Sequence, residues 1–144
     1  MTDSVFRWSD AWLLHAVAVA DRGDGADLAD VIAAGDGINH ALFTDGELHN
    51  GVRRLMDAGL LERREHRLVL AGPAADVWQR CRERSNAAAS AEFRRLLNAP
   101  EWAPGAMETP VSSDSWPSAG DLQAANSEYD RRMRELRRLR SKQK

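Results

Sequence analysis

The sequence of 144 residues contains only one cysteine, Cys81. A single cysteine excludes an internal disulfide and a zinc site built from several cysteines. Long apolar runs are also missing: the longest, residues 11–20, is interrupted by His15 and is too short for a membrane span of about 20 residues. The first ten residues lack the basic and apolar stretches of a secretory signal. We therefore expect a cytoplasmic protein without a membrane partner.

Motifs for catalysis, phosphate binding and metal binding are absent from the sequence. It has neither a glycine-rich phosphate loop nor a Gly-x-Ser-x-Gly nucleophile elbow. The four histidines lack the spacing of a zinc site, and no two carboxylates stand out as an acid–base pair. We therefore predict no catalytic residue, no metal and no cofactor, and we keep an unrecognised enzyme as the last alternative.

Cys81 itself has two interpretations. Arg80 and Arg82 flank it, and adjacent positive charge lowers the pKa of a thiol and makes it reactive. Val77, four residues earlier, shares a helix face with Cys81 and indicates a buried, structural cysteine. We favour the buried interpretation.

Charge is distributed unevenly along the chain. Hydrophobic residues make up 43% and charged residues 29%, which is typical of one globular domain. The net charge is −2, but residues 131–144 contain eight basic residues and one acid, a net of +7. The first 130 residues therefore carry −9. This pattern predicts an acidic body followed by a basic tail.

Two helices are predicted in the first forty residues. Ser9 is the expected N-cap of the first helix, which ends at Gly23 and Gly25. Asp27 opens the second helix, and Gly35 and Gly37 are expected to end it. The apolar residues of the second helix have the spacing of one buried stripe: Leu28, Val31 and Ile32. His15, within the first helix, is expected to be structural.

The third helix has the clearest local signals. Thr44 and Glu47 have the spacing of a capping box, in which each side chain bonds the other residue's backbone N–H. Phe43 and Leu48 occupy the two positions of a hydrophobic staple around that cap. Gly59 fits the left-handed position that ends a helix.

After the third helix the hydrophobic period changes. Residues 60–70 form two short apolar stretches around a polar centre, which predicts a β-hairpin. Gly72 and Pro73 then begin another helix, because proline is tolerated in the first turn. This helix either continues to Leu97 or breaks near Ser85. Its apolar face is formed by Val77, Trp78 and Cys81.

Three segments are predicted: a domain over residues 1–97, a Pro/Ser-rich loop or linker over 98–120, and a basic amphipathic helix over 121–144. Tryptophan is rare in disordered segments, so at least one of Trp102 and Trp116 is expected to pack on the body. The apolar residues of the last helix recur near one stripe: Leu122, Ala125, Tyr129, Met133, Leu136 and Leu139.

The basic tail has three interpretations that can coexist. It packs its stripe on the body, it pairs with a second copy as a short coiled coil, or it binds nucleic acid or an acidic partner. The stripe motivates the prediction of a homodimer. The arginines proposed for an interaction tail are Arg131, Arg132, Arg134, Arg137, Arg138 and Arg140.

Three helices followed by a hairpin resemble the winged-helix domain. Residues 9–71 match its order and length, and the junction Val52–Arg63, with Gly59 before Leu60 and Leu61, is similar to the one between third helix and wing. The resemblance implies a mainly α fold with a small β-hairpin: a winged-helix-like three-helix core, here followed by C-terminal helices. In a DNA-binding member the third helix enters the major groove.

Outward positions of the third helix would then face DNA. They are Asp45, His49, Asn50, Arg53, Arg54 and Asp57. Asparagine and arginine are the residue types that recognise adenine and guanine edges. The residues expected to contact DNA are Asn50, Arg53, Arg54, Arg63, Arg64 and Arg67.

Two features favour protein contacts over DNA. Residues 1–60 contain four arginines and ten acids, a balance that repels phosphate unless the arginines of the third helix and wing cluster. Residues 36–43 also make a longer connection than a simple helix-turn-helix has. We therefore predict a non-enzymatic winged-helix module with a regulatory or protein-interaction role. The alternative is a small DNA-binding transcriptional regulator.

Asn39 and His40 lie in that connection and are the loop residues that we single out for a role in binding or in loop structure. They either bind a ligand or hydrogen-bond the carbonyls of their own loop. We favour the second interpretation, because loops with few backbone partners need side-chain ones.

Overall fold

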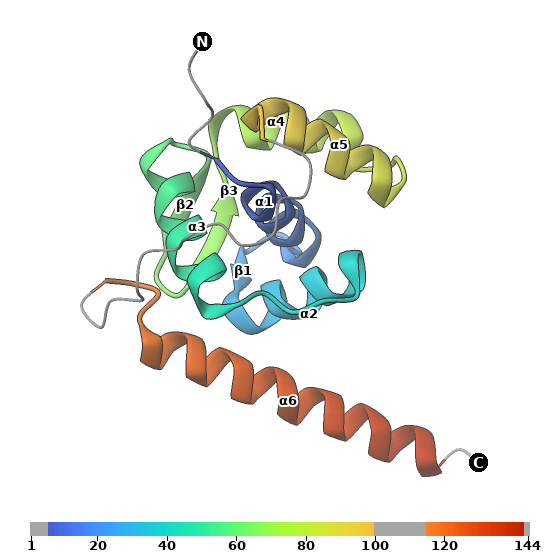
Figure 1. The fold of residues 1–144 in the computed structure, drawn as a ribbon. Helices are drawn as coiled ribbons and strands as arrows, with labels where there is room; N and C mark the ends of the chain where they lie inside the picture. The colour runs from blue at the N-terminus through green and yellow to red at the C-terminus, as the bar shows by residue number, and fades with distance from the viewer. Residues whose placement is uncertain (1–5, 100–114, 143–144) are drawn as a thin grey trace.

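α1, Trp8–Ala20, lies at the centre of the fold and contacts α2, α3, α5 and β3. The computed structural model describes residues 6–99 and 115–142. It is mainly helical with one small antiparallel sheet, which confirms the predicted fold class (Figure 1). The remaining elements in chain order are β1 Ala26–Asp27, α2 Leu28–Asn39, α3 Asp45–Asp57, β2 Leu61–Arg64, β3 Arg67–Leu70, α4 Gly72–Cys81, α5 Asn86–Leu97 and α6 Ala119–Lys142.

The start of α1 differs from the prediction. Arg7 is the N-cap, and its backbone N–H donates to the Asp10 carboxylate over 2.8 Å. Ser9 therefore lies inside the first turn, and the expectation that it caps the helix is wrong. A carboxylate three residues into the helix satisfies the free N–H and also suits the positive end of the helix dipole.

α2 begins as predicted but ends later. The Asp27 carboxylate accepts from the Asp30 backbone N–H over 2.7 Å. Gly35 and Gly37 lie within the helix, which continues to Asn39, so the prediction that they end it is wrong. Gly35 is required by packing, since a Cβ there would overlap the Phe43 ring. Its carbonyl accepts from the indole N–H of Trp12 over 3.0 Å.

Gly35 and Gly37 make a matched pair for mutation. Gly35→Ala is expected to lower the free energy of unfolding by about 1–3 kcal/mol, because the added methyl group meets Phe43 in a filled core. Gly37→Ala is expected to raise it by about 0.5–1 kcal/mol, because a Cβ at this exposed position meets nothing and alanine favours the helix. Urea denaturation of both variants measures the difference. Equal stability of the two would contradict the packing of Phe43 on Gly35.

α3 confirms the local signals of the sequence. The Thr44 hydroxyl accepts from the Glu47 N–H over 3.0 Å, and the Glu47 carboxylate accepts from the Thr44 N–H over 2.9 Å. Gly59 has a φ of +76°, which lets the Leu60 N–H donate back to the Leu55 carbonyl over 2.9 Å. The buried face of α3 packs on α1 through Leu48, Val52 and Leu55.

The sheet contains the predicted hairpin and one further strand. β2 and β3 pair antiparallel, with Leu61 opposite Leu70. β1 adds to the other edge of β3, with Ala26 opposite Leu68, so the strand order is β1-β3-β2. A strand of two residues has no alternating pattern, and the sequence therefore did not indicate it.

The helical segment after the sheet breaks, which was one of the two alternatives. Ser85 caps α5 by accepting from the Ala88 N–H over 3.1 Å. Cys81 is buried on the inner face of α4 with Val77, and burial raises the pKa of its thiol. The buried interpretation of Cys81 is confirmed, and the interpretation of a thiol with a lowered pKa is wrong.

α6 begins two residues earlier than predicted. Ser118 caps it, since its hydroxyl accepts from the Asp121 N–H over 3.2 Å and the Asp121 carboxylate accepts from the Ser118 N–H over 2.8 Å. Trp116 packs against the core, which confirms that a tryptophan of the linker docks; Trp102 lies outside the described residues. α6 lies along α2 and its C-terminal end projects beyond the body (Figure 1).

Candidate functional site

The outward side of α3 and the β2–β3 hairpin form what we call the α3–hairpin face. His49, expected there as an outward residue, is instead buried. Its Nδ1 lies 2.6 Å from the carbonyl oxygen of Pro117. The outward prediction for His49 is wrong because the segment before α6 crosses this side of α3.

Arg54 forms an ion pair with a buried carboxylate. Its Nη2 and Nε donate to the two carboxylate oxygens of Asp10 over 2.8 and 3.0 Å. Asp10 is completely buried, and 26% of the Arg54 side chain is exposed. The guanidinium therefore joins α3 to α1, and its Nε–Nη2 edge is already used.

Asn50 is also turned toward its own helix. Its amide nitrogen donates to the Gly46 carbonyl over 3.0 Å, and the residue is half-buried. Arg53 is exposed, and among the described residues no ion pair or hydrogen bond engages its guanidinium. Of the three α3 residues predicted to contact DNA, Arg53 alone makes no side-chain hydrogen bond or ion pair within the described residues.

Each arginine of the hairpin contacts a partner within the protein. The Arg63 guanidinium lies over the Trp116 ring, 4.4 Å from its centroid, and its Nε donates to the Glu65 carbonyl over 2.6 Å. Arg64 pairs with Glu62 over 3.3 Å. Arg67 donates to the Gly25 carbonyl over 3.2 Å. These contacts spread the basic groups over separate partners, and the exposed ion pairs of Arg64 with Glu62 and of Arg67 with Asp24 are easily released.

The start of α6 adds a further contact to this side of the molecule. The Asn126 amide donates to the Asp45 carboxylate, at the first residue of α3, over 3.3 Å. Together with Trp116 over Arg63 and Pro117 on His49, this contact covers part of the α3–hairpin face. The chain's own C-terminal region therefore occupies surface that a DNA duplex would need.

The first half of α6 is anchored to α2, as the packing interpretation of the tail predicted. Leu122 and Tyr129 are buried, and the Tyr129 hydroxyl donates to Asp36. Burial, together with this bond to a carboxylate, raises the pKa of Tyr129 to about 12. Arg132 donates to Asp30 over 2.7 Å and to Glu128 over 3.0 Å. Arg132 of the basic tail is thus bound to the body, whereas Arg131 pairs with Glu128 on its own helix.

The second half of α6, residues 134–142, is exposed, and we call it the distal arm. Leu136 and Leu139, expected on the packed stripe, are 47% and 46% exposed because the body ends before them. Arg138 pairs with Glu135 on the same helix. In the described part of the chain, four basic side chains of the arm have no ion pair: Arg134, Arg137, Arg140 and Lys142. The distal arm is therefore an apolar and strongly basic surface.

Asn39 and His40 have backbone roles that the sequence did not reveal. Asn39 is the last residue of α2, and His40 has a φ of +54°. The His40 backbone N–H donates to the Asp36 carbonyl over 2.7 Å. Within the described residues neither side chain makes the loop hydrogen bond that we expected, because this left-handed turn satisfies the carbonyl through the backbone.

Asp10 is the residue of this region that sequence reasoning missed, and the expected docking of Trp116 did not indicate that Arg63 would lie over its ring. Asp10 and Trp116 act through partners distant in the chain, and only the spacing of Asp10 from the helix start was a local signal. In the described ranges no group of three or more His, Cys, Asp and Glu side chains has metal-binding geometry. No helix there is both long and apolar enough to cross a membrane. Comparison with protein-family models, curated proteins and solved structures finds no match.

Proposed function

We propose that residues 9–71 are a winged-helix module without a catalytic role, and that the chain acts through protein contacts of its distal arm. The order α1-β1-α2-α3-β2-β3 supports the first part, since it contains three helices followed by a hairpin. An acidic body and the absence of a catalytic motif from the sequence support the second.

The observation that carries the proposal is the contrast between a covered face and an exposed arm. On the α3–hairpin face, Arg54 is bound to buried Asp10, and the Trp116–Pro117 segment contacts Arg63 and His49. At the distal arm, two leucines stand about half exposed among free cations. Exposed apolar groups within a charged rim are typical of a protein-binding surface.

The occupant that the charges favour is the acidic body of a second copy. Residues 23–52, which include α2 and the start of α3, contain six acids and no lysine or arginine. Leu42 lies in this stretch of the sequence and is 50% exposed, so the acidic stretch also contains an exposed apolar residue. Two arms carry the same positive charge and repel each other. The predicted homodimer would therefore join arm to body and not arm to arm.

Sedimentation velocity at tens of micromolar protein tests this arrangement. We expect a dimer at near-physiological salt that the double substitution Leu136→Ser and Leu139→Ser converts to a monomer, because the apolar part of the contact is lost. Leu42→Ser should have the same effect from the other side of the interface. Val19→Ser is the matched control, since Val19 is 43% exposed near the C-terminal end of α1, outside the proposed contact, and its substitution should leave the dimer intact.

Two results would overturn the proposal. One is a wild-type chain that sediments as a monomer under these conditions, or a dimer that survives the leucine substitutions. The other is tight binding to one duplex DNA sequence that Arg53→Ala abolishes, which would establish the DNA-binding regulator instead. Binding of mixed-sequence duplex that is steep in salt and indifferent to both leucines would make the arm a phosphate-binding element.

A further inference from the structure

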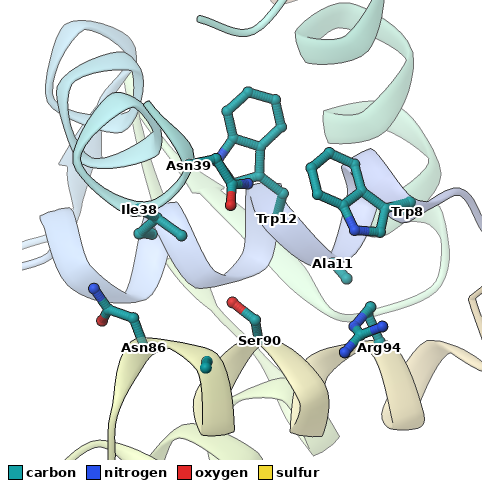
Figure 2. A pocket seen from close by; sticks show the side chains of 9 residues that line it. Trp8, Ala11, Trp12, Ile38, Asn39, Asn86, Ser90 and Arg94 are labelled. Atoms are coloured by element: carbon teal, nitrogen blue, oxygen red, sulfur yellow. The ribbon is translucent and has the colours of Figure 1, made fainter. Parts of the chain in front are cut away.

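A groove of about 470 Å³ lies on another side of the molecule, between α1, the end of α2 and α5. Its size is within the range of small-molecule sites, which is about 300–1,000 Å³. Figure 2 shows the side chains that line it: the indole rings of Trp8 and Trp12 belong to α1, and polar side chains project from α5 toward α1. The lining residues are Trp8, Ala11, Trp12, Ile38, Asn39, Asn86, Ala87, Ser90 and Arg94.

One wall of the groove is aromatic and rigid. The Trp8 and Trp12 rings lie 5.6 Å apart, and Trp12 stacks on Phe43 with centroids 3.7 Å apart. The bond from the Trp12 indole to the Gly35 carbonyl fixes the orientation of that ring. Trp12 is nearly buried, whereas Trp8 is half-buried and presents part of its surface. Such a wall favours a flat apolar group, because aromatic pairs gain energy beyond simple burial.

The opposite wall is polar and carries one positive charge. Asn86, Ser90 and Arg94 are four residues apart, so α5 presents all three on one face (Figure 2). The Ser90 hydroxyl lies 2.9 Å from Nδ1 of buried His15 and is held in place. Arg94 is half-buried, and no carboxylate within the described ranges pairs with its guanidinium.

Among the described residues, acids are absent from the lining of the groove, and this favours an anionic ligand. The first 130 residues carry a net charge of −9, yet no Asp or Glu among the described residues lines this groove. In the described part of the chain, Arg94 is the only charged residue of the lining, and it has no ion pair there. A partly desolvated guanidinium binds a carboxylate through two strong, charge-assisted hydrogen bonds.

We propose that this groove binds a small aromatic carboxylate, with its ring against Trp8 and Trp12 and its carboxylate on Arg94. The amides of Asn39 and Asn86 and the Ser90 hydroxyl are then available to other polar groups of the ligand. The site is separate from the distal arm, and the end of α2 contributes Ile38 and Asn39 to its lining.

The probe is 2-naphthoate, titrated into the ¹⁵N-labelled full-length protein and followed by NMR. The indole N–H signals of Trp8 and Trp12 and the amides of Ser90 and Arg94 are expected to shift together. Arg94→Gln should weaken binding roughly tenfold or more, because a charge-assisted bond is lost. Arg95→Gln is the matched control: Arg95 is exposed on the same helix and pairs with Glu92, and its loss should change affinity less than twofold.

Two further measurements test whether the ligand occupies the groove itself and whether its negative charge is required. Ala87→Leu fills the groove from an exposed position, and it should block binding while leaving the thermal unfolding midpoint unchanged. The neutral 2-naphthamide should bind at least tenfold more weakly than the acid. Absence of binding at millimolar naphthoate, equal affinity of acid and amide, or equal affinity of the Arg94→Gln and Arg95→Gln variants would overturn the proposal.

Discussion

Replacement of Arg54 by methionine is expected to lower the free energy of unfolding by about 3 kcal/mol. Arg54 donates to both carboxylate oxygens of Asp10, which is completely buried between α1 and α3. Without the guanidinium the carboxylate keeps the Arg7 backbone N–H but loses its counter-ion. An unpaired buried charge costs several kcal/mol, much more than the loss of an exposed pair.

The neighbouring arginine is the control. Arg53→Met removes the same charge from the same helix at an exposed position, and stability should change by less than about 0.5 kcal/mol. Guanidinium denaturation of both variants gives the two values. The double variant Asp10→Asn with Arg54→Met should recover part of the loss, because no charge then remains buried without a partner. Similar stability of the Arg53 and Arg54 variants would show that the pair does not hold α3 on α1.

Acidification from pH 6.5 to pH 4 is expected to remove about 3 kcal/mol of stability through one residue, His15. Burial lowers the pKa of His15 from 6.5 to about 4. Between these values the unfolded chain binds a proton on this imidazole and the folded chain does not. The contribution of His15 is therefore complete above pH 6.5 and is lost as the pH falls toward 4.

Denaturation at a series of pH values tests this with two histidine variants. His15→Leu should be less dependent on pH between 6.5 and 4 than the wild type, because the buried titrating group is gone. The variant should fold, since the His15 Nε2 has no hydrogen-bond partner and Ser90 keeps access to the groove. His66→Gln alters an exposed histidine of the hairpin turn and should leave the pH dependence unchanged. If the free energy of unfolding depended on pH in the same way for the wild type and His15→Leu, His15 would not be the residue responsible for the loss of stability.

Local signals in the sequence predicted the elements that depend on local contacts. The capping box of Thr44 and Glu47 and the left-handed Gly59 involve residues within one turn of each other, and the structure confirms both. The errors come from contacts that the local pattern does not contain. Gly35 has the composition of a helix end but lies inside α2, because the Phe43 ring occupies the space beside it.

The candidate site was predicted less well than the fold for the same physical reason. Helical spacing correctly placed Arg53 on the surface of α3, but it placed His49 and Arg54 there as well. Their partners, Pro117 and Asp10, are 68 and 44 residues away in the chain. A period of 3.6 residues shows which side chains share a helix face, and it contains no information about which distant segment covers that face.

Only the first part of α6 packs on the body, and the exposed remainder of the helix therefore has a defined length. The helix has 24 residues, and Arg132 is its last ion-paired contact with α2 among the described residues. At about 1.5 Å per residue, the ten residues beyond Arg132 extend about 15 Å. An unbroken helix loses little conformational freedom when its tip is captured, whereas a flexible tether of the same length loses much more. A partner that binds the C-terminal end of α6 is therefore held at a fixed distance and in a fixed orientation relative to the body.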